Sequence, residues 1–435
     1  MSDRAYDVLV VGGGPAGSIA ALVLARAGAR VALVDKATFP RDKACGDLVG
    51  PRGVRALDEL GVDIPGSRRV DDMIVVGPTR RKVTLPGYEG NTYPGHGIAV
   101  PRTTFDAALH AAAVDAGAEP IAARADEPQY GRDGSVNGFM LSDRRCVRAD
   151  FVVGADGATS RVADAAGLVD PRRVLWGFAL RAYVDDPVQV PHIVFWESPS
   201  WRGFPGYGWL FPGIGGTANL GLGLGLLSDR RAAGRAAQAF DAFVDSLYRF
   251  GVLTGPRVPT SPRLGGWLKL GMIGTTPARD RVLLAGDAAG LVNPLQGEGI
   301  SQAMGSARGV AEAILAEPGR AALRYRRFLA ATYAPYQSLV APMHRALLPH
   351  PVAIALIGRM LTAPAVGRTI AGAWSLFWND LLEGARPRPS REFAALVSAL
   401  GRVATRPTTT NRWFVQTLAA HDPSEVESSI PVSMP

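Results

Sequence analysis

Three glycines near the N-terminus have the spacing of a phosphate-binding turn. Gly12, Gly14 and Gly17 form a G-x-G-x-x-G pattern directly after the apolar run 6–11. The first glycine permits a tight turn, the second lets a pyrophosphate approach the backbone, and the third lets a helix pack closely on a strand. Asp35 follows at the distance where a carboxylate can accept hydrogen bonds from a ribose diol and repel a 2′-phosphate.

The elements around these residues are those that such a site requires. The run 6–11 is typical of a strand buried on both faces, residues 18–27 have a helical pattern, and 30–34 form a second strand that ends at Asp35. The helix N-terminus offers unpaired N–H groups and partial positive charge to phosphates. The sequence therefore predicts a dinucleotide site. The residues expected to bind the dinucleotide here are Gly12, Gly14, Ala16, Gly17, Asp35 and Lys36.

Three later segments indicate which dinucleotide is bound. Residues 151–157 (FVVGADG) form a strand and turn, 281–284 form a short strand followed by GDAAG, and 293–299 read NPLQGEG. With the N-terminal pattern, these segments resemble the flavoprotein group that includes para-hydroxybenzoate hydroxylase, flavin halogenases and geranylgeranyl reductases. The resemblance implies FAD as the cofactor, with Asp287 on the ribityl chain and the following peptide and helix against the flavin.

The resemblance adds further residues to the expected FAD site. Arg102, in the segment PRTTFD, corresponds to an arginine at a helix start near the cofactor, although an ordinary exposed residue in a first helical turn is the alternative. The complete set of additional FAD-binding residues that the resemblance implies is Cys45, Gly46, Arg102, Asp156, Gly286, Asp287, Gly297, Gly299 and Ile300.

Two more segments narrow the resemblance to geranylgeranyl reductases. Residues 40–46 (PRDKACG) match P-x-x-K-x-C-G, and residues 207–212 (YGWLFP), followed by the G-x-G of 221–223, match a second signature of these enzymes. Gly290 stands where many hydroxylases carry a histidine. The resemblance extends from about Tyr6 to Met304 and says little about the last hundred residues.

Of the residues in these signatures, Cys45 has the widest range of possible chemical roles. It could donate a proton to an alkene, tune the flavin or fill space as a small hydrophobe, which is the usual role of a buried free cysteine. The residues alone favour space filling, whereas the resemblance favours a role near the reacting carbon. The other cysteine, Cys146, lies among arginines on an expected strand and is interpreted as structural.

Aromatic residues alternate along one expected strand and so point to one face. Such a stripe is more often plain core, but beside a flavin it suits the wall of an apolar, elongated pocket. We expect Cys45, Tyr207 and Trp209 to act in catalysis. The expected substrate-binding residues are Tyr207, Trp209, Phe211, Gly221, Gly223 and Pro294.

Composition excludes several classes of protein. The 435 residues are 47% hydrophobic and 20% charged, which excludes a disordered chain. Two cysteines cannot form a disulfide framework, no signal-peptide pattern opens the chain, and no uncharged apolar run of about 18 residues appears. We expect a cytoplasmic protein, at most peripheral to a membrane. The net charge of +8 comes mostly from arginine, with only four lysines, and we expect no nucleic-acid partner. The six histidines are scattered, so no metal site is expected.

The expected fold is α/β, with a discontinuous Rossmann-like FAD-binding domain of residues 1–70, 96–175 and 270–320. A β-rich substrate domain is expected over 71–95 and 176–269, and a helical region over 321–435 with breaks at Pro335, Pro342, Pro349 and Pro351. The stretch 346–378 is either an amphipathic cap that touches a membrane or an ordinary helical core, and the polar tail beyond about Thr405 is expected to be loosely packed.

The resemblance implies reduction of carbon–carbon double bonds in an isoprenoid chain, on a geranylgeranyl lipid or a prenyl-quinone tail. The chief alternative is an FAD-dependent monooxygenase or halogenase acting on an aromatic or polyketide substrate. A halogenase would need a lysine near its substrate, for which Lys82 is the candidate, and a flavin-holding scaffold without turnover is a third alternative. NAD(P)H and a ferredoxin both stay open as the electron donor, and the oligomeric state stays open too.

Overall fold

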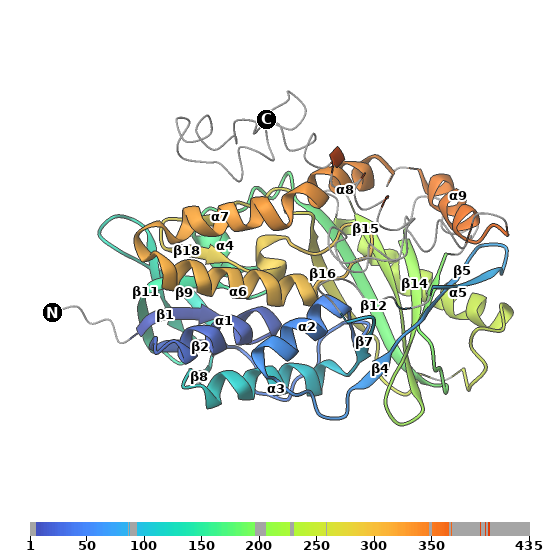
Figure 1. Ribbon diagram of the computed structural model, residues 1–435, viewed down its shortest axis with the longest axis horizontal. Coiled ribbons are helices and arrows are strands. Elements are labelled where there is room, and N and C mark those ends of the chain that lie inside the picture. Colours follow the sequence, from blue (N-terminus) through green and yellow to red (C-terminus); the bar gives the residue numbers. More distant parts are fainter. Residues whose placement is uncertain are drawn as a thin grey trace.

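The computed structural model describes residues 6–85, 87, 94–195, 206–226, 230–257, 259–347, 350–364, 367, 392, 396, 399 and 400. Two sheets dominate it, an eight-stranded one at the end that carries the N-terminus and a seven-stranded one at the other end (Figure 1). Helices pack on the first sheet and continue as an outer layer toward the second (Figure 1). The fold is mixed α/β, as the sequence predicts.

The first sheet is parallel through most of its width and has the order β17-β18-β11-β1-β2-β8. The antiparallel strands β9 and β10 extend it from β11, and β17 pairs antiparallel with β18. Its strands are β1 (Tyr6–Val11), β2 (Val31–Asp35), β8 (Glu119–Ala122), β9 (Ala125–Tyr130), β10 (Val136–Leu141), β11 (Cys146–Gly154), β17 (Ala278–Arg279) and β18 (Val282–Leu284).

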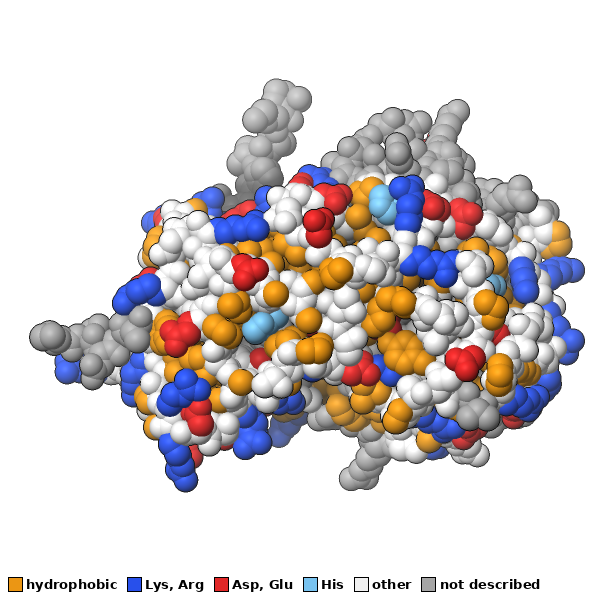
Figure 2. Space-filling model, turned by 90° about the horizontal axis from the view of Figure 1, so that it is seen from below, with side chains coloured by type: hydrophobic (Ala, Val, Ile, Leu, Met, Phe, Trp, Pro, Cys, Tyr) orange, Lys and Arg blue, Asp and Glu red, His pale blue; other side chains and the backbone are white. Residues whose placement is uncertain are grey.

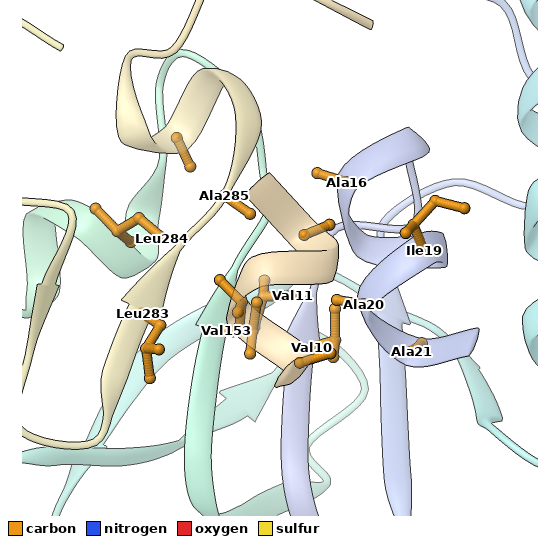
Figure 3. Close-up of a cluster of buried hydrophobic side chains, with 14 of the residues drawn as sticks. Val10, Val11, Ala16, Ile19, Ala20, Ala21, Val153, Leu283, Leu284 and Ala285 are labelled. Atoms are coloured by element: carbon orange, nitrogen blue, oxygen red, sulfur yellow. The ribbon is translucent and has the colours of Figure 1, made fainter. Parts of the chain in front are cut away.

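Helices that are rich in small residues cover this sheet. In α1, alanines at the sheet-facing positions allow a close approach to the buried valines of β1 and β11, which Figure 3 shows at the top of these strands. Helix α1 lies between α3 and α6, and α7 packs on α6. The helices are α1 (Pro15–Arg26), α2 (Pro51–Leu60), α3 (Arg102–Asp115), α4 (Arg161–Ala165), α6 (Ile300–Ala316) and α7 (Ala321–Thr332).

The second sheet has the order β16-β12-β15-β14-β13-β5-β6 and is antiparallel except where β13 pairs with β5. Its strands are β5 (Met73–Val76), β6 (Lys82–Leu85), β12 (Leu175–Asp185), β13 (His192–Val194), β14 (Gly206–Pro212), β15 (Thr217–Leu226) and β16 (Leu264–Leu270). Helix α5 (Ala236–Arg249) buries Phe240 and Phe243 against one face. The small sheet β3-β7-β4 is formed by Leu48–Val49, Gly97–Ala99 and Arg68–Val70.

Within the described residues, the helices α8 and α9 follow α7, and α8 corrects a prediction. Helix α8 (Ala334–Leu347) continues through Pro342, whereas the sequence predicted a break there. Pro335 lies in the first turn of α8 and Pro351 begins α9 (Pro351–Leu361), positions where a missing N–H costs no helical hydrogen bond. Pro349, most of the stretch 346–378 and the tail beyond Thr405 lie outside the described residues.

Two surface properties bear on partners. Among the described residues, no helix is long and apolar enough to span a membrane. On the face shown in Figure 2, Lys and Arg side chains are interspersed with acidic and hydrophobic ones and gather mainly toward the rim. The described part of this face therefore shows no continuous basic patch of the kind that tracks a nucleic-acid backbone.

Candidate functional site

The predicted FAD-binding segments meet at one edge of the first sheet. Strands β1, β2, β11 and β18 run parallel, so their carboxyl ends lie together. The chain order changes direction between β1 and β11, which makes this edge a topological switch point where ligands of open α/β sheets bind. Gly12 follows β1, Asp35 ends β2, Asp156 follows β11 and Gly286 follows β18.

The glycine turn after β1 has a conformation that only glycine fits. Gly12 has a φ of +105°, and a Cβ there would lie 2.3 Å from the carbonyl oxygen of Ala155. A Cβ on Gly17 would lie 1.6 Å from the Gly12 carbonyl oxygen, so helix α1 lies directly on the turn. The N–H of Gly13 donates to the Asp35 carboxylate at 2.6 Å, which joins the turn to the end of β2.

Two helix N-termini point at this edge, and neither N-cap residue makes a side-chain hydrogen bond, although in α6 the Glu298 carboxylate accepts the Ser301 N–H at 2.9 Å. Helix α1 begins with Pro15, its N-cap Gly14 makes no side-chain bond, and its first turn has no acidic residue. Helix α6 begins at Ile300 with Gly299 as an equally uncapped N-cap. Uncapped N–H groups and the positive end of the helix dipole suit the pyrophosphate and the electron-rich end of a flavin.

Two acidic residues of the predicted set have different surroundings. Asp287 is partly exposed, and its carboxylate lies 3.5 Å from the Nζ of Lys43. Asp156 instead accepts hydrogen bonds from the Ser160 hydroxyl at 2.5 Å and the Arg161 N–H at 2.7 Å. The Asp156 carboxylate thus fastens the turn before α4, while Asp287 remains available to a polyol. Lys36 is exposed after β2.

Arg102 is buried at the start of α3 rather than an ordinary exposed residue. Only 4% of it is exposed, and its guanidinium forms two hydrogen bonds of 2.7 Å with the fully buried carboxylate of Asp106. Arg41 also reaches Asp106, at 2.9 Å. The carboxylate raises the pKa of Arg102 against the opposing effect of burial, so a fixed positive charge lies beside the Cys45 turn.

The turn of Cys45, Gly46 and Asp47 lies where the two sheets meet. Cys45 is half-buried and packs against the core of the first sheet, while its carbonyl oxygen accepts a 2.8 Å hydrogen bond from Asn219 of the second sheet. The Sγ of Cys45 accepts the Asp47 N–H at 3.4 Å. Burial raises the pKa of the Cys45 thiol, the charge of Arg102 lowers it, and that of Asp47 raises it. Cys146 is exposed at the start of β11, away from this turn.

The aromatic side chains of β14 share one face, as predicted, and they support this turn. Trp209 and Phe211 are 6% and 8% exposed and pack with Leu48 of β3. A Cβ on Gly46 would lie 2.8 Å from the Phe211 ring, so a glycine is required where the turn crosses the aromatic face. Gly221 likewise leaves room for the Trp209 indole, which a Cβ would approach to 2.2 Å.

Tyr207 connects the second sheet to the segment before α6. Its hydroxyl donates a hydrogen bond to the carbonyl of Gln296. Gly297 lies next to Tyr207, because a Cβ on Gly297 would be 3.5 Å from the Tyr207 hydroxyl oxygen. Pro294 is buried in the same segment, and Gly223 is the residue opposite Tyr207 on β15. The predicted substrate-binding residues therefore lie on one side of the region where the two sheets meet, which we call the junction. Their roles toward a substrate stay predictions.

A buried polar network that the sequence did not predict lies behind the aromatic face. The carboxylate of Asp47, 3% exposed, accepts hydrogen bonds from the hydroxyl of Tyr183 and, at 2.8 Å, from the amide of Asn219. The Asn219 amide oxygen accepts the indole N–H of Trp209 at 2.9 Å. Polar groups therefore lie directly behind the expected apolar wall, and they are hydrogen-bonded to one another. The sequence offered one signal for this network: Asp47 directly follows the Cys-Gly pair of the P-x-x-K-x-C-G signature.

Burial has a large effect on the pKa of Asp47. It raises the pKa of this carboxyl to about 6, although the hydrogen bonds from Tyr183 and Asn219 and the charges of Arg181 and Arg102 lower it. Asp47 therefore exchanges a proton close to neutral pH, next to a thiol that stays protonated there. A protonated thiol beside a carboxyl group that exchanges its proton can supply protons in an otherwise enclosed site.

The lysine positions differ from the expectation for a halogenase. Lys82 is exposed on β6. Lys269, on β16, is 1% exposed, and its ammonium donates a 2.8 Å hydrogen bond to the Ala288 carbonyl beside Asp287. Burial lowers the pKa of Lys269 to about 8, against the acidic groups of Asp156, Asp164 and Asp287. Among the described residues no three His, Cys, Asp or Glu side chains form a group that could hold a metal ion.

Sequence comparisons agree with this geometry. The family model described as "FAD binding domain" matches residues 5–198. A menaquinone reductase of Mycolicibacterium smegmatis is 35% identical over 321 residues, which are 72% of this chain and 76% of the relative. A digeranylgeranylglycerophospholipid reductase of Methanopyrus kandleri is 31% identical over 303 residues, which are 68% of this chain and 73% of the relative.

Solved structures show the same fold at lower identity. A geranylgeranyl bacteriochlorophyll reductase-like protein of Thermoplasma acidophilum has a TM-score of 0.64 at 22% identity, covering 85% of this chain and 99% of its own. A flavin-dependent brominase has a TM-score of 0.67 at 18% identity, covering 92% of this chain and 99% of its own. Structural likeness alone does not separate reductases from halogenases.

The switch-point edge, its glycine turn and the FAD-binding family model define an FAD-dependent oxidoreductase. Within that class the chain belongs to the geranylgeranyl reductase family. The residues present fit FAD: the uncapped N-terminus of α1 for the pyrophosphate, the start of α6 for the flavin, Asp35 for a ribose and Asp287 for the ribityl chain.

Proposed function

We propose that this protein uses reduced FAD to saturate carbon–carbon double bonds of an isoprenoid chain, on a geranylgeranyl lipid or on the prenyl tail of a quinone. The identity to a menaquinone reductase and to an archaeal lipid reductase supports both substrate classes. The observation that carries the proposal is the Cys45 turn, which is held between the FAD-binding sheet and the aromatic strand β14.

Each part of the site has a chemical task in this reaction. Reduced FAD, when bound, supplies a hydride. An unconjugated alkene is a poor hydride acceptor, so a proton must reach the other carbon at the same time or earlier. Burial keeps the Cys45 thiol protonated near neutral pH, which makes it the proton donor in our proposal. The neighbouring Trp209 and Phe211 fix its turn and help to exclude water.

Anaerobic reoxidation of the flavin tests this function. The purified holoprotein is reduced with dithionite and mixed with geranylgeranyl diphosphate, which has no quinone ring to accept the electrons, and flavin absorbance is followed. Wild type should reoxidise, whereas Cys45→Ser should be slower by at least about 100-fold, the usual contribution of a positioned acid. Cys146→Ser is the matched control because Cys146 is exposed and remote, and it should behave like wild type.

A monooxygenase or halogenase would behave differently in the same experiment. Its reduced flavin would persist with this substrate until oxygen was admitted, and that result would contradict the reductase proposal. The exposed position of Lys82 and the hydrogen bond of Lys269 to Ala288 both argue against a halogenase lysine at the junction.

We also propose that the protein contacts a lipid surface through α9. Val352, Leu356 and Met360 are 80%, 56% and 49% exposed and recur every four residues, so they share one helix face. Flotation with anionic vesicles tests this contact. Wild type should float and Leu356→Glu should remain in the dense fraction, whereas equal flotation of both would exclude α9 as the contact.

A further inference from the structure

A series of polar groups connects the buried carboxyl group of Asp47 with the surface. The hydroxyl of Tyr183 donates to Asp47, and the Arg181 guanidinium stacks on the Tyr183 ring with its centre 4.4 Å from the ring centroid. Arg181 is 1% exposed and pairs with Asp42, whose side chain is 43% exposed. Contiguous polar side chains thus extend from the Cys45 turn to water.

Asp47 occupies its position at a cost in folding free energy. It is a non-glycine residue with a φ of +60°, a left-handed conformation that glycine would adopt with less strain. Its side chain is 3% exposed, and its Oδ1 has no hydrogen-bond partner among the described residues. A residue that is unfavourable both in backbone conformation and in burial needs a reason outside folding.

Resting on the reductase function above, we propose that Asp47 is the acid that reprotonates Cys45 during turnover, and that the hydroxyl of the partly exposed Tyr183 passes protons from water to Asp47, while Arg181 and Asp42 hold the Tyr183 ring in place. Both hydrogen bonds that Asp47 accepts end on Oδ2. The proton of the neutral carboxyl group therefore sits on Oδ1, the oxygen without a partner.

The proton transfers balance. The alkene gains hydride at one carbon as its π bond breaks, and the other carbon gains the proton of the Cys45 S–H bond. The thiolate then takes the Oδ1 proton of Asp47. The Tyr183 hydroxyl passes its proton to Oδ2 and takes one from water, and rotation of the carboxyl group returns the protonated oxygen to the Oδ1 position. One hydride and one solvent proton are consumed for each double bond, and Cys45, Asp47 and Tyr183 return to their starting states.

The charges around Asp47 favour a carboxyl group that exchanges its proton at the pH of the reaction. Its burial opposes ionisation, while the hydrogen bonds and positive charges favour it, so neither form dominates strongly near neutrality. The polar and titratable groups that face it from the turn, α3, β12 and β15 are Cys45, Arg102, Arg181, Tyr183 and Asn219.

Asp47→Asn is the direct test, because asparagine tolerates the left-handed backbone and its amide oxygen can accept both hydrogen bonds. With geranylgeranyl diphosphate or a menaquinone, we expect steady-state turnover to fall at least about 100-fold. FAD content and reoxidation by oxygen should stay unchanged. Wild-type turnover should fall as pH rises above about 6, the pKa of Asp47, and the variant should lose this dependence.

Two further variants separate proton supply from folding. Tyr183→Phe should slow steady-state turnover about tenfold yet leave the first anaerobic turnover unchanged, because the thiol is already protonated at the start. Asp186→Asn removes another buried carboxylate, one that accepts the N–H groups of Thr254 and Gly255, and should keep wild-type turnover. Wild-type turnover with an unaltered pH profile in Asp47→Asn overturns the proposal.

Alkylation of Cys45 gives a readout that needs no isoprenoid substrate. In a Cys146→Ser background, the pH dependence of iodoacetamide modification reports the pKa of the Cys45 thiol. The negative charge of Asp47 raises this pKa, so Asp47→Asn should shift the alkylation profile to lower pH. If wild type reduces no isoprenoid, the reductase function fails, and an unshifted alkylation profile then separately overturns the coupling of Asp47 to Cys45.

Discussion

At the scale of single residues, the junction holds charged groups that are expensive to bury, and each has a partner nearby. Arg102 and Asp106 neutralise each other beside Cys45. Asp47 is instead surrounded by neutral donors and more distant positive charges, which leave its pKa at about 6. Asp106 is thereby paired with a buried cation, whereas Asp47 can exchange a proton.

Removal of Arg102 should destabilise the fold. Arg102→Met leaves the buried Asp106 with Arg41 as its remaining cation, and breaking such a buried pair costs about 3 kcal/mol. Denaturant unfolding measures this loss. Arg30→Met, which breaks an exposed pair with Asp7, is the matched control and should change stability by less than about 0.5 kcal/mol. Equal losses in both variants would contradict the buried role of Arg102.

Asp47 should make stability depend on pH in the direction opposite to that of an ordinary paired carboxylate. Its folded pKa of about 6 is above the unfolded value of 3.8, so the unfolded state ionises first. Stability should therefore fall by up to about 3 kcal/mol as pH rises from about 4 to 6, and then level off. Asp47→Asn should lack this fall in denaturant unfolding, and an identical pH profile in both proteins would refute the assignment.

The sequence predicted residues whose role depends on local spacing. Asp35 was predicted as a ribose-binding residue from its distance along the chain, and the Cys45 turn was predicted from a signature of seven residues. The hydrogen bond from Gly13 to the Asp35 carboxylate was not predicted. Asp47, Tyr183 and Asn219 were not predicted, because their network joins positions 47, 183 and 219 of three separate segments. Only the pairing of β12, β14 and β15 brings them together.

At the scale of elements, the two faces of β14 pack against different neighbours. Its odd-numbered aromatic residues pack toward the Cys45 turn, while Gly208 faces α5, where a Cβ would lie 2.1 Å from the Phe243 ring. The two-residue period alone predicts this division. The period does not predict what covers each face, and in the structure the Cys45 turn packs on part of the aromatic face.

Helix α1 can approach β1 only because residue 17 is glycine. Gly17→Ala places a Cβ 1.6 Å from the Gly12 carbonyl oxygen, so the helix must move away from the phosphate-binding turn. We expect the variant to lose most of its bound FAD, as measured by flavin absorbance per protein after desalting. Gly319→Ala, which has nothing within 4 Å of its Cβ, should retain FAD. Full FAD retention by Gly17→Ala would contradict the described packing.

A proline in the sequence proved an unreliable indicator of a helix end. A proline usually interrupts a helix because it lacks an N–H and its ring contacts the preceding turn. Helix α8 nevertheless continues through Pro342, with Gln337, Val340 and Ala341 of the same helix buried. Burial of the helix face outweighs the lost hydrogen bond here, and this burial depends on neighbours that a single segment does not reveal.

At the scale of the whole molecule, two sheets with different patterns define the site between them. The parallel sheet gathers its glycine turns at one edge, and the antiparallel sheet presents β14 and β15 to the same region. The hydrogen bonds of Asn219 to Cys45 and of Tyr207 to Gln296 cross this junction at two places. Both sheets therefore hold the Cys45 turn and the segment before α6 in place.

The mass of the product formed without oxygen tests the central claim most directly. Holoprotein reduced with dithionite is incubated anaerobically with geranylgeranyl diphosphate or a menaquinone, and the extracted product is analysed by mass spectrometry. The account predicts a gain of two hydrogen atoms for each saturated double bond, one hydride and one proton, and a loss of this product in Cys45→Ser. Unchanged substrate mass under these conditions, with an oxygen-containing or halogenated product once oxygen and halide are supplied, would contradict it.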